Sequence, residues 1–98
     1  MDLVVTVERI EGHCPVYNLG DSFLLKDGFR LASDKPLCMH ALASLMPFYN
    51  ALRFAQPEHL GLADKEHPGK AVIQCPDPCA LTGGGTVTFS ISRTTEKT

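Results

Sequence analysis

The stretch GTVTFSIS, residues 85–92, decides the fold class because apolar and polar side chains alternate along it without a break. Val87, Phe89 and Ile91 share one face of an extended chain, and threonine and serine share the other. Such alternation is typical of a strand that rests one face on a core. We therefore expect a sheet in which the outward face carries Thr86, Thr88, Ser90 and Ser92.

Further strands are indicated upstream of this stretch. Residues 3–10 are rich in valine and threonine, and residues 22–25 and 71–75 are short apolar runs of strand length. Asp27-Gly28 is a hairpin signal, so the chain is expected to return as a brief strand at residues 29–31. The sequence therefore predicts four to five strands.

One long helix is predicted over residues 36–54. Asp34 can cap its first turn, and Pro36 is tolerated there. Pro47 lacks a backbone N–H and is expected to kink the helix. Polar residues are confined to a narrow stripe, so most of the helix is expected to be buried. The stripe consists of His40, Ser44, Pro47 and Asn50, and the expected core contacts are Leu42, Leu45, Phe48, Tyr49 and Leu52.

The order of these elements predicts an α+β fold. One long kinked helix would pack on a small, mostly antiparallel sheet of four to five strands that could curve into a barrel. Residues 56–70 show no periodicity and are expected to form a loop. The length fits a single domain over residues 4–93, with residues 94–98 as a frayed tail.

Composition excludes several classes of partner. The net charge is −2, so the chain lacks the basic surface of a nucleic-acid-binding protein. The longest apolar-rich stretch, residues 37–55, contains too many polar side chains to cross a membrane. The first residues do not resemble a secretory signal peptide. We therefore expect a cytoplasmic protein with reduced cysteines and no disulfide.

Four cysteines are the strongest indication of chemistry. Cys14 lies in Gly-His-Cys-Pro, Cys38 stands near the start of the predicted helix, and Cys75 and Cys79 enclose Pro-Asp-Pro. In a reducing compartment, such a set favours thiol or metal chemistry over disulfide bracing. The four are therefore the candidate site residues.

The spaced motifs resemble a family of small uncharacterised prokaryotic single-domain proteins built on Cys-Pro…Gly-Asp…Cys…Cys-Pro-Asp-Pro. The likeness covers residues 4–93 and implies that Cys14, Cys38 and Cys75 are the motif cysteines. In many members of that family, the segment at the first cysteine resembles Cys-Pro-x-Gly-His. This chain departs from that pattern at residues 16–20, and the family supplies no activity to carry over.

Three interpretations of the cysteines stay open. The first is a metal site, in which Cys14, Cys38, Cys75 and Cys79 hold zinc or an iron–sulfur cluster and His13 or His40 could replace one thiolate. Against it, Cys14 and Cys75 each precede proline, which removes an N–H that could tune a bound sulfur. The second is a reactive thiol at Cys38, favoured by the helix N-terminus. The third is that all four are buried packing residues.

These interpretations predict different functions. If the first and fourth strands are parallel neighbours, their ends would bring Cys14 and Cys75 together beside Cys38. The chain would then carry a cysteine-lined site for zinc, an iron–sulfur cluster, thiol redox chemistry or sulfur handling. If the cysteines only pack, the chain would be a non-catalytic interaction module that binds another protein or forms a homodimer.

Overall fold

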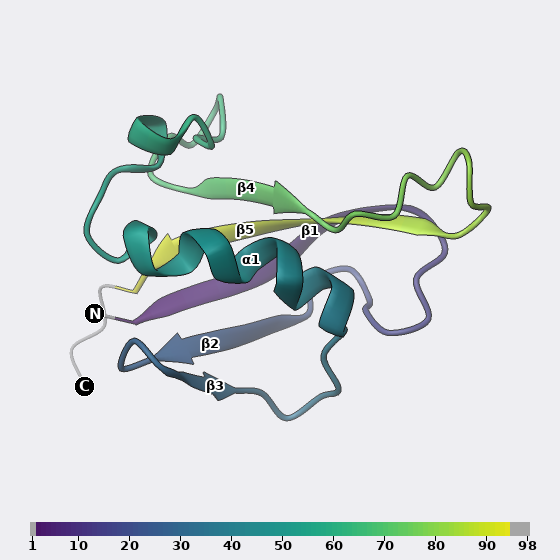
Figure 1. Ribbon diagram of the computed structural model, residues 1–98, viewed down its shortest axis with the longest axis horizontal. Helices are drawn as coiled ribbons and strands as arrows, with labels where there is room; N and C mark the ends of the chain where they lie inside the picture. Colours follow the sequence, from purple (N-terminus) through teal and green to yellow (C-terminus); the bar gives the residue numbers. More distant parts are fainter. Residues whose placement is uncertain (1, 95–98) are drawn as a thin grey trace.

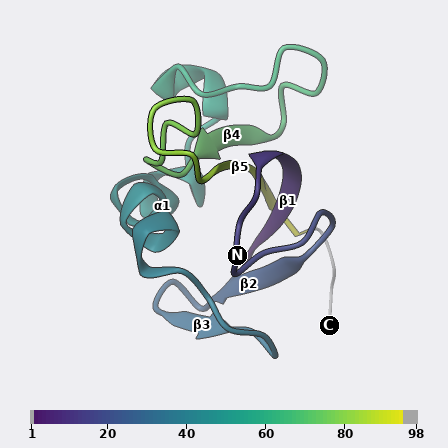
Figure 2. The ribbon, with the colours of Figure 1, turned by 90° about the vertical axis from the view of Figure 1, so that its right-hand side faces the viewer.

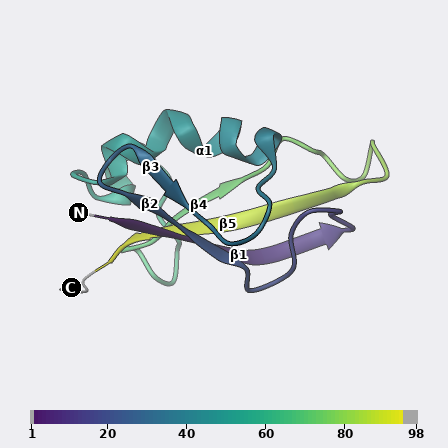
Figure 3. The same cartoon turned by 90° about the horizontal axis from the view of Figure 1, so that it is seen from below.

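The computed structural model describes residues 2–94, which form one α-helix, one 3-10 helix and five strands. The strands form one sheet, and α1 lies across one of its faces (Figures 1 and 3). In chain order the elements are β1 (Leu3–Gly12), β2 (Ser22–Lys26), β3 (Arg30–Ala32), α1 (Met39–Leu52), η1 (Pro57–Leu60), β4 (Ala71–Gln74) and β5 (Gly85–Arg93). The predicted α+β class is confirmed.

The sheet is antiparallel and open. Its order is β3-β2-β1-β5-β4, and each neighbouring pair runs antiparallel. The expectation of a barrel is therefore wrong. The two edge strands, β3 and β4, have three and four residues and stand at opposite edges, so they do not pair to close the sheet.

The hairpin between β2 and β3 follows its sequence signal. Asp27 and Gly28 both have positive φ, of 59° and 84°, as the tight turns that suit a hairpin require. The N–H of Phe29 donates to the carbonyl of Lys26 at 3.1 Å and closes the turn. The return strand begins one residue later than predicted, at Arg30.

The core lies between the helix and the inner face of the sheet. Val87, Phe89 and Ile91 of β5 are buried as predicted. They meet the alternate residues of β1 and β2 and three residues of α1. These partners are Leu3, Val5, Val7, Phe23, Leu25, Ala41, Leu45 and Leu52.

The outer face of β5 is less exposed than predicted. Thr86 and Ser90 are 6% and 3% exposed, because β5 has a neighbouring strand on each side. The Ser90 hydroxyl donates to Glu8 at 2.7 Å, and the Thr86 hydroxyl donates to the carbonyl of Asp77. These hydrogen bonds satisfy the buried hydroxyls.

The helix is shorter and less buried than predicted. It spans Met39–Leu52 without a break at Pro47, so the predicted long kinked helix is wrong. Pro47 and Ala43 both lie on the exposed side, where water can reach the Ala43 carbonyl that proline leaves without a donor. Asp34 is not the cap, because the extended residue before the helix is Cys38.

One face of α1 is buried rather than most of its surface. Leu45 and Leu52 are buried as predicted, and Leu42 and Tyr49 are half-buried against the core. Phe48 is exposed, contrary to prediction. A single sheet can cover only one side of a helix, so apolar residues on the far side stay in water.

The remaining connections are anchored. Residues 61–64 run along the free edge of β4, where the N–H of Val72 donates to the carbonyl of Leu62 at 2.8 Å. Residues 56–70 were expected to form a loop, and they include η1. The N–H of Thr94 donates to the backbone carbonyl of Asp2, while residues 95–98 of the expected frayed tail lie outside the described residues.

Over residues 2–94, no helix has the length and apolarity needed to cross a membrane.

Candidate functional site

Three of the four cysteines line one cavity, which we call the cysteine pocket. Its volume is about 340 Å³, and it lies at the end of the molecule where α1 begins and β1 and β4 end. Figure 1 shows this end on the side of the β4–β5 connection, and Figure 2 views the molecule from that end. The lining residues are His13, Cys14, Pro15, Val16, Tyr17, Cys38, His40, Ala41, Cys75, Pro76, Asp77, Gly84, Gly85 and Val87.

The topology brings these segments together in a way that differs from the prediction. β1 and β4 run in the same direction, but β5 lies between them and is antiparallel to both. Cys14 and Cys75 therefore follow strands that stop at the same end of the sheet, on either side of the residue where β5 begins. Gly85 permits the close approach there, because a Cβ on it would lie 2.5 Å from the carbonyl oxygen of His13.

Cys14 is partly exposed and its sulfur accepts backbone hydrogen bonds. The N–H groups of Val16 and Tyr17 point at Cys14 Sγ at 3.4 and 3.3 Å. The N–H that Pro15 lacks, which the sequence argument counted against a bound sulfur, is thus replaced by two others. Pro15 removes the N–H of the next residue only, and the turn brings in the two that follow. N–H groups in this position stabilise negative charge that develops on sulfur.

Cys75 is buried, and its thiol is fully occupied by the neighbouring strand. The N–H of Val87 donates to Cys75 Sγ at 3.3 Å, and the thiol faces the Gly85 carbonyl at 3.7 Å. The residue is 7% exposed and belongs to the hydrophobic core. Here the packing interpretation fits better than a reactive thiol.

Cys38 is the extended residue that precedes α1, and it is half-buried. Its N–H donates to the Tyr17 hydroxyl at 3.0 Å, which fixes the helix start against the 13–17 segment. Lys35 and Asp21 reinforce this junction through an ion pair of 2.8 Å. The Lys35 ammonium lowers the pKa of Asp21 below its usual range, and an N–H from Asn18 adds to the effect.

Tyr17 is a pocket residue that the sequence did not reveal. It is 4% exposed, and its ring packs edge-on against Phe89 with centroids 5.3 Å apart. Burial raises the pKa of its phenol, opposed by the N–H bond from Cys38, so the hydroxyl stays protonated at neutral pH. An isolated tyrosine in a turn carries no sequence signal for this role.

Asp77 organises the other wall of the pocket. Its carboxylate accepts hydrogen bonds from the Thr82 hydroxyl and from the N–H groups of Cys79 and Gly85. The Thr82 hydroxyl is the main reason that the pKa of Asp77 is lowered, and partial desolvation opposes it. Aspartate before proline is a turn signal, so the sequence did point to this bend but not to its place in the pocket.

Cys79 lies outside the cysteine pocket. Its thiol faces the Gly84 carbonyl at 3.4 Å, and it lines a separate hollow with Glu11 and Thr86. All four cysteines are free in the structure. Over residues 2–94, no three His, Cys, Asp or Glu side chains are grouped as a metal ion requires. Zinc or iron–sulfur binding by the four cysteines therefore stays a prediction without structural support.

Comparison of the chain with models of known families, with curated proteins and with solved structures found no match. The assignment of a function therefore depends on the pocket itself.

Proposed function

We propose that the cysteine pocket is a site of thiol chemistry on small sulfur compounds, with Cys14 as the nucleophile. The supporting observation is the environment of Cys14: the residue is partly exposed and lines a cavity, and its Sγ accepts two backbone N–H bonds. The thiolate is the reactive form of cysteine. Donors placed at the sulfur favour the charge that this form carries.

The reaction would be exchange at a sulfur–sulfur bond. The Cys14 thiolate attacks one sulfur of the compound, a new bond forms to Sγ, and the original sulfur–sulfur bond breaks. The departing sulfur takes the electron pair as a thiolate and is protonated by water. This step needs no metal, and it fits redox exchange or sulfur transfer equally.

The cysteines would have different roles in this proposal. Cys38 adds a second, half-buried thiol to the wall, next to the start of α1. Cys75 would not react, because its sulfur is buried and hydrogen-bonded to β5. Cys79 is an internal reference, because it is partly exposed but lies outside the pocket.

The test is the rate at which each cysteine is modified by propyl methanethiosulfonate, followed by peptide mass mapping. We expect Cys14 to react about tenfold faster than Cys79, given the dependence of thiol reactivity on its surroundings. Cys14→Ser should abolish the fast phase, and Cys75→Ser should leave it unchanged. A fast phase that is lost in Cys38→Ser instead, or that belongs to Cys79, would contradict the assignment.

The metal alternative has its own measurement. Elemental analysis and an ultraviolet–visible spectrum of protein purified without oxygen would detect bound zinc or an iron–sulfur cluster. Under the thiol proposal, we expect less than stoichiometric metal and four titratable thiols after denaturation. One metal or cluster per chain that is lost in Cys14→Ser would favour the metal site instead.

A second candidate function, a homodimer or another protein complex, is supported by the edge of the sheet at β3. Phe29 and Leu31 are exposed there, beside a groove that Met46 and Tyr49 of α1 also line. An edge strand with apolar side chains is a common interaction surface. Sedimentation of wild type and Phe29→Ser would test it, because only a dimer formed at this edge should dissociate in the variant.

A further inference from the structure

The walls of the cysteine pocket are mostly apolar. They include Pro15, Val16, Ala41, Pro76 and Val87, and among the residues that line the pocket there is no lysine or arginine. A volume of about 340 Å³ suits a small molecule. An anion that entered such a site would lose hydration without gaining a positively charged partner.

Asp77 adds a fixed negative charge to this wall. Its three hydrogen-bond donors keep the pKa of the carboxyl below its usual range, with the Thr82 hydroxyl as the largest cause, so the group is ionised at neutral pH. With His13 and His40 counted as neutral, the formal charge of the lining is −1. An anion that approaches Cys14 through this pocket is therefore repelled.

We propose, on the basis of the thiol function proposed above, that the pocket selects an uncharged, apolar sulfur–sulfur compound and rejects anionic ones. The compound class is a small dialkyl disulfide. The Cys14 thiolate bonds to one of its sulfurs, the sulfur–sulfur bond breaks, and the other alkyl sulfur leaves as a thiolate that water protonates. Inorganic thiosulfate and other anionic sulfur donors would be poor substrates.

The test compares three thiosulfonate reagents of similar length on the full chain at pH 8. Propyl methanethiosulfonate is neutral, the 2-sulfonatoethyl reagent is anionic, and the 2-trimethylammonioethyl reagent is cationic. In each reaction, Cys14 Sγ bonds to the reagent's thiol sulfur, and methanesulfinate leaves with the electron pair. Each rate is divided by the rate with a free cysteine peptide, which removes intrinsic reactivity.

We expect the normalised rate at Cys14 to be about tenfold lower for the anion than for the neutral reagent, because the Asp77 carboxylate lines the same pocket. The cation should fall between them. At about 1 M salt, where the screening length is about 3 Å, the anion and cation rates should converge. Asp77→Asn should produce the same convergence at low salt.

The outcomes separate the two proposals. If Cys14 shows no fast phase with any of the three reagents, the proposed function fails. If Cys14 reacts fast but the anionic and neutral reagents give equal normalised rates, the thiol site stands and its selectivity for uncharged compounds is overturned. The salt series applies to wild-type protein, so it decides the role of charge even if Asp77→Asn does not fold.

Discussion

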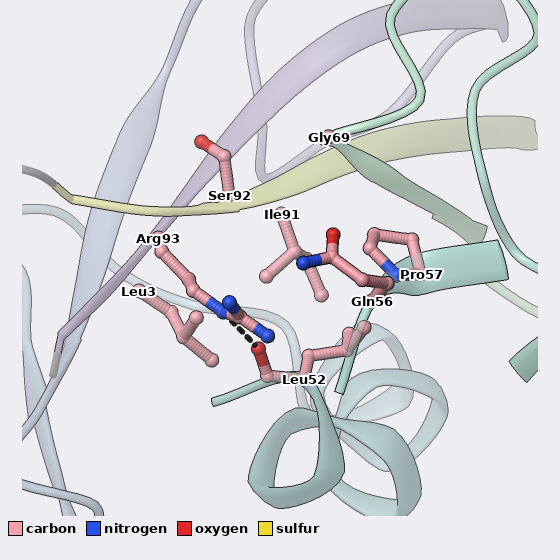
Figure 4. Close-up of a pocket in the computed structure, with 8 residues that line it drawn as sticks. All are labelled: Leu3, Leu52, Gln56, Pro57, Gly69, Ile91, Ser92 and Arg93. Carbon is pink, nitrogen blue, oxygen red and sulfur yellow. Dashed lines mark hydrogen bonds between the residues drawn. The ribbon is translucent and has the colours of Figure 1, made fainter. Parts of the chain in front are cut away.

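The two ends of α1 each border a cavity, and the two cavities use their polar groups in opposite ways. At the C-terminal end, Arg93 of β5 donates from Nε to the Leu52 carbonyl at 3.0 Å and from its terminal nitrogen to the Ala55 carbonyl at 2.6 Å. Figure 4 shows this guanidinium between β5 and the end of the helix. Its charge is thus directed into the protein, where it satisfies carbonyls that a helix end leaves without donors.

At the N-terminal end, reactive groups face the cavity instead. Cys14 and Cys38 are partly exposed. A backbone N–H donates to the Cys14 sulfur, and the backbone N–H of Cys38 donates to the Tyr17 hydroxyl. The cavity at the Arg93 end is also smaller, about 110 Å³ against about 340 Å³. One end of the helix is therefore closed by hydrogen bonds from Arg93, whereas the other opens on the larger cavity where the proposed thiol chemistry would take place.

The largest effect on stability is expected from Arg93→Met. The variant leaves two carbonyls without their charged donor and removes a cation that favours a helix C-terminus, which should cost about 2–3 kcal/mol. Urea unfolding would measure the loss, with Arg9→Met as the matched control. Arg9 pairs with Glu11 on the surface, where about 0–1 kcal/mol is expected.

The thiol chemistry should be unaffected in Arg93→Met, because the arginine lies at the opposite end of α1. A fast phase at Cys14 that slowed severalfold in this variant under native conditions would contradict the separation of the two ends.

A smaller effect is expected from Tyr17→Phe. The ring can still pack on Phe89, but the N–H of Cys38 loses its acceptor, which should cost about 1–2 kcal/mol. The thermal midpoint should fall by roughly 4–8 °C per kcal/mol for a chain of this size. Tyr49→Phe is the matched control, because its hydroxyl donates to the Gly28 carbonyl away from the cysteine pocket.

These two tyrosine variants sharpen the comparison further. Both should lower stability by a similar amount, whereas only Tyr17→Phe should change the rate of Cys38 modification. Equal rates at Cys38 in the two variants would show that Tyr17 does not position this thiol.

The smallest effect is expected from Asp77 and depends on pH. Hydrogen bonding in the folded state lowers the pKa of this carboxyl below 3.8, so its contribution to stability is complete above that value. The contribution is lost as the pH falls through the folded pKa. The difference in unfolding free energy between wild type and Asp77→Asn should therefore shrink between pH 6 and pH 3.

Asp64→Asn is the control for the pH series. The N–H of Glu66 lowers the pKa of Asp64 in the same direction, so its stability profile should respond to acid with the same sign. Asp64 lies far from the cysteine pocket in sequence and does not line it, so only Asp77→Asn should alter the modification of Cys14. A stability difference for Asp77→Asn that grew on acidification would contradict the assigned hydrogen bonds.

Much of the sheet could be predicted from local sequence. The alternation at Val87, Phe89 and Ile91 predicts a strand and its buried face, because side chains on an extended chain alternate with period two. Asp27-Gly28 predicts its hairpin, because the required positive φ values depend on the two residues themselves.

The extent of the helix and the shape of the sheet could not be predicted in this way. Apolar residues run around most of residues 36–54, but whether each is buried depends on which side the sheet covers. Phe48 and Leu45 are equally apolar, yet Phe48 is exposed and Leu45 is buried. In the same way, the lengths of β3 and β4 and their separation at opposite edges decide that the sheet stays open.

By itself, the sequence determined which segments are extended or helical, and that Cys14 and Cys75 follow strand ends while Cys38 precedes the helix. Those properties depend on residue type and local backbone geometry. Only the tertiary structure decided that β5 separates β1 from β4, that Cys14, Cys38 and Cys75 share a pocket while Cys79 does not, and that Tyr17 joins its walls. These are contacts between distant residues, and strand order and packing fix them.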